Sequence, residues 1–195
     1  MLDNKLLRPE IIVFAGPNGS GKSTMTRMVK TIGAYINADD IKKANLCSDM
    51  EAAIKAEELR EAMLEKEADF TFETVLSTDR NLKLLRRAKE NGYFVRGIYV
   101  LTSNPDVNVV RVNVRESLGG HGVPEEKIRT RYYRALKLIP QLVEVCDVLH
   151  IYDNTNAPFR IFKKRGDICF GWENRYWSKK DIEELTGVCG FIESK

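Results

Sequence analysis

Residues 16–24, with the sequence GPNGSGKST, have the composition and spacing of a loop that binds phosphate groups. Glycines let the backbone curl so that successive N–H groups point inward, and the N-terminus of a following helix adds positive charge. In this arrangement the Lys22 ammonium reaches the β- and γ-phosphates of a nucleoside triphosphate, and the Ser23 hydroxyl ligates Mg²⁺. The sequence therefore predicts ATP or GTP as a ligand, with Mg²⁺ as its ion. The predicted nucleotide-binding residues are Gly16, Pro17, Asn18, Gly19, Ser20, Gly21, Lys22, Ser23 and Thr24.

Acidic side chains follow two predicted strands farther along the chain. Asp39 and Asp40 come after the short pair Tyr35-Ile36, and Glu73 comes after residues 70–72. Because ligand-binding groups gather at the carboxyl ends of strands in α/β sheets, we expect these carboxylates near the phosphate loop. A kinase needs one carboxylate to accept the proton of the acceptor hydroxyl and another to hold Mg²⁺ or orient the acceptor. Asp39 is the candidate base, while a helix N-cap at Asp39 or Asp40 and a plain loop role for Glu73 stay open.

Five arginines flank the glycine-rich segment 119–122 on two predicted helices. A transferring phosphoryl group spreads negative charge over its oxygens, and arginines of a closing lid can neutralise that charge. Arg115 and Arg131 are the favoured pair, because they lie nearest the segment or on its far side. Surface ion pairs and helix caps are the alternative for each arginine, and His121 is expected to be a hydrogen-bonding loop residue rather than an acid or base. The five are Arg111, Arg115, Arg129, Arg131 and Arg134.

One more polar segment, residues 153–156 (DNTN), follows the last predicted parallel strand. In α/β sheets this position often borders the base of a bound nucleotide, which makes Asn154 a candidate nucleotide contact. Asn and Asp are also common in plain turns, so a turn without a ligand is an equal alternative.

Apolar runs alternate with amphipathic segments along the chain, which predicts an α/β fold with a mostly parallel sheet covered on both faces. The predicted strands are 11–15, 35–36, 69–74, 94–101 and 147–152. The predicted helices are 23–30, 51–67, 79–91, 105–116 and 124–139, with Pro140 as a kink or restart. In helix 51–67 the residues expected to share one face are Ile54, Ala56, Leu59 and Met63.

The C-terminal region has a different pattern. Residues 160–172 predict a hairpin with Gly166 at its turn, and Ser178 and Asp181 form a capping box for a short helix that Gly187 ends. We therefore expect a three-layer P-loop NTPase sandwich with an arginine-rich helical lid and a small C-terminal hairpin plus helix. Residues 1–195 form one predicted domain, with a core over about 8–158 and an appendage over 159–195.

Composition excludes several protein classes. Of 195 residues, 43% are hydrophobic and 30% charged, which is typical of a globular protein rather than a disordered, collagen-like or membrane-spanning chain. The net charge of +3 is too small to indicate a nucleic-acid partner. The four cysteines show no metal or redox spacing, and the N-terminus lacks the apolar core of a signal peptide, so a cytoplasmic protein with reduced thiols is expected.

Several of these segments together resemble the zeta-toxin-like P-loop kinases. They are FAGPNGSGKST (14–24), INADD (36–40), FETVLS (72–77), RVNVRESLGGHGVPEEKIRTRY (111–132) and IYDNT (151–155). The resemblance covers about positions 11–158 and implies that Asp39 is the catalytic base, that Lys22, Arg115 and Arg131 act on the transferred phosphoryl group, and that Glu73 and Thr74 hold the substrate or the metal. Zeta toxins phosphorylate UDP-N-acetylglucosamine and are neutralised by a small helical antitoxin, so the resemblance also implies a nucleotide-sugar acceptor and an antitoxin-like partner.

Two classes of function fit these observations. The leading prediction is a kinase that transfers the γ-phosphoryl group of ATP or GTP to a hydroxyl of a small metabolite, such as a nucleotide sugar. The alternative is a nucleotide-switched regulatory ATPase without an acceptor. Asp39 separates them, because a switch has no use for a base that points at an acceptor hydroxyl. A kinase or end-processing enzyme acting on nucleic acid is disfavoured by the low net charge.

Overall fold

The computed structural model describes residues 8–193, and in that range the chain forms one eight-stranded sheet with eight helices. The strand order is β2-β3-β1-β4-β5-β6-β7-β8, and the first five strands in this order are parallel. This arrangement confirms the expected α/β class. The parallel strands are β1 (Glu10–Ala15), β2 (Ala34–Ile36), β3 (Phe70–Thr74), β4 (Phe94–Leu101) and β5 (Val148–Asp153).

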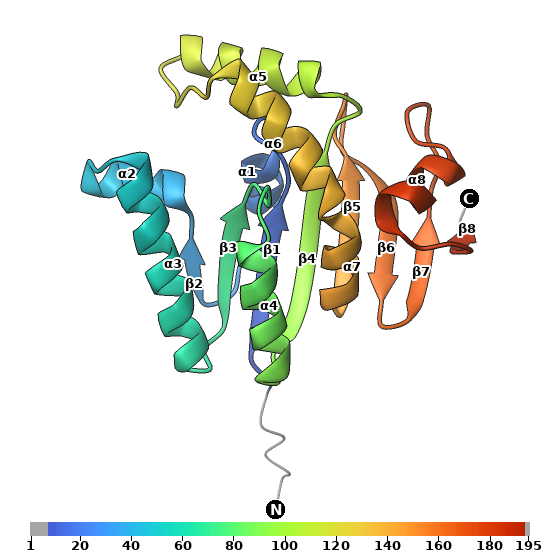
Figure 1. Ribbon diagram of the computed structural model, residues 1–195, viewed down its shortest axis with the longest axis horizontal. Helices are drawn as coiled ribbons and strands as arrows, with labels where there is room; N and C mark the ends of the chain where they lie inside the picture. Colours follow the sequence, from blue (N-terminus) through green and yellow to red (C-terminus); the bar gives the residue numbers. More distant parts are fainter. Residues whose placement is uncertain (1–7, 194–195) are drawn as a thin grey trace, which may run out of the picture.

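The central strands are buried on both faces because helices cover both (Figure 1). Ile11 and Val13 of β1 belong to the large core, to which α3 (Asp49–Glu65), α4 (Arg80–Glu90), α7 (Ile139–Val145) and α8 (Lys179–Thr186) contribute. Ile12 and Phe14 point to the other face and pack with Met25 of α1 (Lys22–Met28) in a smaller core. Successive side chains of β1 therefore point into the cores on opposite faces of the sheet, which explains why the sequence of this strand is continuously apolar.

Helix α3 buries a different stripe from the one expected. Its buried residues are Ala52, Ala56, Arg60 and Leu64, which recur every fourth position. Ile54 and Leu59, assigned to the buried face from the sequence, are 47% and 45% exposed. Small side chains at every fourth position form a narrow stripe on one side of a helix, and larger apolar residues off the stripe remain in solvent. The prediction for these two side chains was wrong, although the helix itself is present.

Helix α2 (Ala38–Asn45) begins earlier than expected, and neither acidic residue is its N-cap. Asn37 takes that position, because its side-chain oxygen accepts a hydrogen bond from the Asp39 backbone N–H at 2.9 Å. Asp39 and Asp40 both lie in the first turn, where their charges favour the positive end of the helix. The capping alternative is therefore wrong for both residues, and their carboxylates are free of that role.

Helices α5 (Pro105–Ser117) and α6 (Glu125–Lys137) lie across the top of the sheet in Figure 1, joined by the predicted glycine-rich segment. They share a small core of their own, formed by Val109, Val112 and Ile128. Helix α6 ends where the sequence anticipates, and Pro140 lies in the first turn of a new helix, α7. The lid is thus a helical pair with a small core of its own, and Leu136 of α6 also packs against the main core.

The C-terminal elements extend the same sheet. Strands β6 (Phe159–Arg165) and β7 (Ile168–Gly171) form the expected hairpin, and Gly166 at its turn has a left-handed φ of 57°. The capping box between Ser178 and Asp181 begins α8, which Gly187 ends. Beyond it, β8 (Ile192–Glu193) pairs with β7 and was not anticipated. Because β6 pairs with β5, the appendage continues the sheet of the core.

Candidate active site

The phosphate loop connects β1 to α1 and is shaped by glycine. A Cβ on Gly16 would lie 2.0 Å from the Val100 carbonyl oxygen, so no other residue fits beside β4. Gly21 has a φ of 101°, and a Cβ there would lie 2.3 Å from the Asn154 amide nitrogen. Lys22 folds back over the loop and donates hydrogen bonds to the carbonyls of Gly16 and Pro17 at 2.7 and 3.0 Å. The two hydrogen bonds hold the Lys22 ammonium over the loop.

The electrostatic surroundings of Lys22 are mixed. Burial lowers the pKa of its ammonium from 10.5 to about 8. The carboxylates of Glu73 and Asp39 oppose this shift, and the Arg115 guanidinium adds to it. The charge of Lys22 is therefore sensitive to these three side chains, which places all of them within electrostatic range of the position that a triphosphate would take.

Two asparagines brace the loop from outside. Asn154 donates a hydrogen bond to the Ser20 carbonyl at 2.8 Å, and Asn108 of α5 donates to the Asn18 carbonyl at 2.5 Å. Asn108 in turn accepts a hydrogen bond from the buried Thr102 hydroxyl. The amide of Asn154, predicted as a nucleotide contact, is thus committed to the loop itself. Asn108 has no sequence motif and was not anticipated.

Glu73 is the hub of the polar contacts beside the loop. Its Oε1 accepts hydrogen bonds from the Thr26 hydroxyl at 2.7 Å and the Tyr35 hydroxyl at 2.6 Å. Its Oε2 accepts one from the Ser23 hydroxyl at 3.2 Å. The Tyr35 hydroxyl has a pKa above its ordinary value, because burial and the Glu73 carboxylate both disfavour the phenolate. Tyr35 therefore stays a donor, and Glu73 is anchored by α1 and β2 rather than left in a plain loop.

The loop and the acidic residues line one cleft of about 650 Å³. This volume lies within the range of small-molecule sites. Asp39 lines the cleft, whereas Asp40 is outside its lining. The backbone of Gly16 and Pro17 and the buried Ser20 also lie outside it and support the bend of the loop. The predicted site residues that line it are Asn18, Gly19, Gly21, Lys22, Ser23, Thr24, Asp39, Glu73, Thr74, Arg115 and Arg131.

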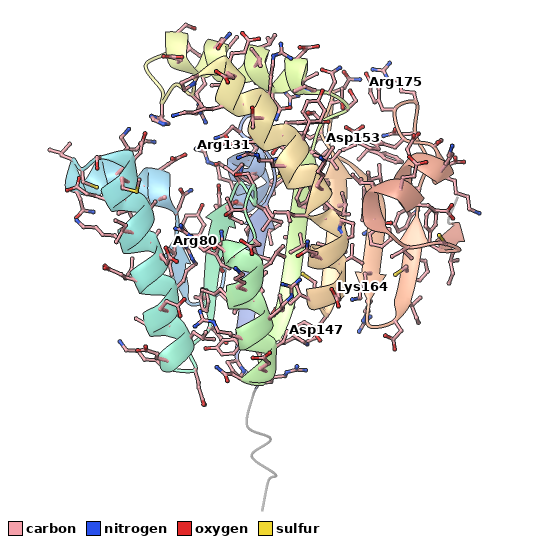
Figure 2. The ribbon with its side chains drawn as sticks, viewed as in Figure 1. Arg80, Arg131, Asp147, Asp153, Lys164 and Arg175 are labelled. Carbon is pink, nitrogen blue, oxygen red and sulfur yellow. The ribbon has the colours of Figure 1, made fainter. Side chains whose placement is uncertain are left out.

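The lid arginines divide into two groups. Arg131 and Arg115 line the cleft, where Arg131 lies 3.4 Å from the Asn18 side-chain oxygen and Arg115 donates to the His121 carbonyl at 2.7 Å. Arg111 also lines the cleft and donates to the Thr155 carbonyl at 3.0 Å. Arg129 instead forms ion pairs with Asp106 and Glu125, at 2.7 and 2.8 Å. Figure 2 shows Arg131 on α6, above the carboxyl ends of the strands.

The lid loop also contacts α2 across the cleft. The Lys42 ammonium lies 3.3 Å from His121 Nδ1 and 2.7 Å from the Asp49 carboxylate. His121 is therefore a loop hydrogen-bonding residue, as expected, and it ties the segment between α5 and α6 to the start of α3. Thr74 faces the cleft, but its hydroxyl accepts hydrogen bonds from the Leu76 N–H at 3.0 Å and the Asn81 amide at 2.8 Å.

Comparison with known proteins gives the relatives of this chain. The family model described as zeta toxin matches residues 33–166, more than half of the chain. The chain belongs to the zeta toxin family. Family membership supports a phosphotransferase of the kinase type, and the kinases of this family use ATP. An uncharacterised protein of Haemophilus influenzae is 28% identical over 133 residues, which are 65% of this chain and 95% of that protein.

Solved structures agree on the fold. A structure from the PezAT chromosomal toxin–antitoxin system of Streptococcus pneumoniae has a TM-score of 0.62 at 16% identity and covers 93% of this chain and 79% of that chain. A structure of AvrRxo1-ORF1:-ORF2 with ATP has a TM-score of 0.66 at 13% identity and covers 91% of this chain and 62% of that one. Within residues 8–193, no helix is both long and apolar enough to span a membrane.

Proposed function

We propose that this protein transfers the γ-phosphoryl group of ATP or GTP to a hydroxyl group of a small metabolite. The observation that carries the proposal is the single cleft shared by the phosphate loop, the Asp39 carboxylate and the arginines of the lid. A protein that only binds nucleotide needs the loop but has no use for a carboxylate placed to accept the proton of an acceptor hydroxyl. Asp39 has that position, and its neighbour Asp40 does not.

The residues have distinct proposed roles. Lys22 leaves the two loop carbonyls to neutralise the β- and γ-phosphate oxygens, which are stronger acceptors for an ammonium. Asp39 accepts the proton of the acceptor hydroxyl as its oxygen attacks the phosphorus. Arg115 and Arg131 neutralise the charge that develops on the transferred group. Their cleft-lining positions support this assignment.

The Ser23 hydroxyl and the Glu73 carboxylate, 3.2 Å apart, are the hard oxygen donors that Mg²⁺ accepts, so the residues present fit this ion. When bound, Mg²⁺ supplies charge neutralisation to the phosphate oxygens. Glu73 is held for this purpose by the Thr26 and Tyr35 hydroxyls. Glu73 and Thr74 also face the side of the cleft where we place the acceptor.

A nucleotide sugar of the UDP-N-acetylglucosamine type is the first acceptor to test, because the chain belongs to the zeta toxin family. One similar structure comes from a toxin–antitoxin system, so a small antitoxin-like protein is the partner we propose. The protein is expected to work in the cytoplasm.

The decisive experiment incubates the purified protein with γ-labelled ATP or GTP and either UDP-N-acetylglucosamine or a bacterial metabolite extract. The kinase predicts a labelled small molecule that is absent with Lys22→Ala. Labelled inorganic phosphate alone, with no labelled metabolite from any fraction, would support the nucleotide-switched ATPase instead.

A further inference from the structure

Arg60 of α3 is a buried cation without a hydrogen-bond partner among the residues that the structure describes. Its side chain is 7% exposed, and its Nε has no acceptor. The guanidinium lies 5.3 Å from the centroid of the Phe72 ring, which offers a cation–π contact but no charge compensation. A buried charge without a carboxylate partner is costly, so it requires another explanation.

The acidic neighbours of Arg60 are engaged elsewhere. Glu57 forms an ion pair with Arg80 at 2.9 Å, and Glu61 forms one with Arg87 at 2.5 Å. Both partners come from α4, so the two carboxylates on either side of Arg60 hold α3 to α4. Burial lowers the pKa of Arg60, while the nearby Glu57 and Glu61 carboxylates oppose that shift and the Arg80 cation adds to it. Even so, a guanidinium remains charged at neutral pH.

The open side of Arg60 is the active-site cleft. Arg60 lines it together with three alanines of α3, Ala52, Ala53 and Ala56, whose small side chains leave space along the wall. Arg80, which Figure 2 labels beside α4, lines the same cleft from the start of that helix. This part of the cleft is where we place the acceptor molecule of the proposed reaction.

We propose that Arg60 binds an oxyanion group of the acceptor, a phosphate or a carboxylate, and so selects acidic acceptors. The planar guanidinium can donate two parallel hydrogen bonds to either group, which supplies the partners that the folded chain lacks. Arg80 lines the same cleft, with its guanidinium paired with Glu57. The inference rests on the proposed function in one respect, because only a kinase has an acceptor. Binding of the anion to Arg60, however, can be measured without phosphoryl transfer.

The test measures anion binding with the phosphate loop already filled. Wild-type protein is saturated with Mg²⁺ and a non-hydrolysable ATP analogue and then titrated with inorganic phosphate or with acetate by calorimetry. We expect saturable binding of at least one anion, weakened about tenfold or more in Arg60→Gln. The two titrations distinguish a phosphate-bearing acceptor from a carboxylate-bearing one.

Arg87→Gln is the matched control, because it removes one positive charge from the same helix pair but lies outside the cleft lining. It should bind the anion as the wild type does. Arg60→Lys keeps the positive charge but lacks the planar guanidinium, so we expect an intermediate loss of anion affinity. This variant keeps the proposal testable if Arg60→Gln folds poorly. Absence of saturable binding in the wild type, or equal affinity in Arg60→Gln, overturns the proposal.

A stability measurement tests the premise separately. If the Arg60 charge is unpaired, Arg60→Met should raise the Tm of the ligand-free protein by about 2 °C or more, because an apolar side chain of similar length avoids the desolvation cost. A lower Tm would mean that the guanidinium stabilises the fold, and would overturn the inference. The two proposals can fail separately. If phosphoryl transfer depends on Lys22 but Arg60→Gln binds the anion normally, the anion site at Arg60 is wrong and the kinase proposal stands. If anion binding depends on Arg60 but no phosphoryl transfer is detected, the kinase proposal is wrong and the anion site stands.

Discussion

At the scale of single residues, the two adjacent aspartates of α2 allow the sharpest test. Asp39→Asn keeps the size of the side chain but removes its basicity, so phosphoryl transfer should fall by about 10²- to 10⁴-fold, roughly 3 to 5 kcal/mol of barrier. Nucleotide affinity should change little, because Lys22 and Ser23 are untouched. Steady-state transfer and calorimetric ATP titration on the same variant measure both quantities.

Asp40→Asn is the matched control for this prediction, since Asp40 shares the first turn of α2 but lies outside the cleft lining. It should retain the wild-type rate. An inactive Asp40→Asn beside an active Asp39→Asn would exchange the two roles. If both variants were active, Glu73 would become the candidate base.

The lowered pKa of Lys22 predicts how ATP affinity depends on pH. In the free protein the ammonium loses its proton as pH rises through about 8, and triphosphate binds best to the protonated form. The dissociation constant for ATP should therefore be flat near pH 7 and rise toward tenfold per pH unit above about pH 8.5. Calorimetry in buffers of different ionisation enthalpy should show proton uptake on binding at pH 9. A flat profile up to pH 9.5 in the wild type would contradict the assignment.

The sequence predicts some of these residues and not others, for a physical reason. The phosphate loop is contiguous, so its glycines, Lys22 and Ser23 identify one another by spacing. The hydrogen bonds of Glu73 come from Thr26 and Tyr35, which lie 47 and 38 positions away along the chain. Such contacts depend on the strand order β2-β3-β1, which periodicity cannot give. Arg60 could not be identified from the sequence, because its burial depends on how α3 packs against the sheet.

At the scale of elements, the parallel strands and the capped C-terminal helix were predictable, because each is encoded by a few adjacent residues. The capping box of α8 and its glycine end appear where the sequence places them. The inner face of α3 was not predictable in the same way, since the choice of stripe depends on what the helix packs against. Packing of α3 in the folded chain buries Ala52, Ala56 and Arg60 and leaves Ile54 and Leu59 exposed.

The helical lid carries the prediction that belongs to this scale. Arg131→Ala should lower the rate of transfer by about 10²-fold or more but weaken ATP binding only slightly, because a lid arginine acts mainly on charge that develops in the transition state. Arg134→Ala is the control, since Arg134 lies on the same helix, is exposed and does not line the cleft. Equal losses in rate and affinity would place Arg131 in ground-state binding. A normal rate would remove Arg131 from the mechanism.

At the scale of the whole molecule, the order of the strands brings the site together. Strands β1 and β3 are neighbours and end side by side, with Ala15 opposite Thr74. The loop after β1 and the carboxylate on β3 therefore meet at one edge of the sheet, as expected for parallel strands. The lid helices follow β4, the next strand in the sheet, so they close over the same edge.

The C-terminal appendage, residues 159–195, shares its hydrophobic core with the rest of the chain. Ile182 of α8 is fully buried, and one continuous core contains it together with Ile11 of β1 and Phe72 of β3. The C-terminal appendage is therefore expected to unfold with the rest of the chain as one domain. Ile182→Ala should cost about 3 kcal/mol and lower the Tm of the whole protein by roughly 6 to 12 °C.

Circular dichroism and the loss of nucleotide binding on heating should report the same midpoint in this variant, because β1, which leads into the phosphate loop, contributes Ile11, Val13 and Ala15 to the destabilised core. The exposed Ile168→Ala, in the same appendage, should leave the Tm nearly unchanged. A separate, earlier transition that leaves nucleotide binding intact would show instead that residues 159–195 form an independent unit, and the single-domain assignment would be wrong.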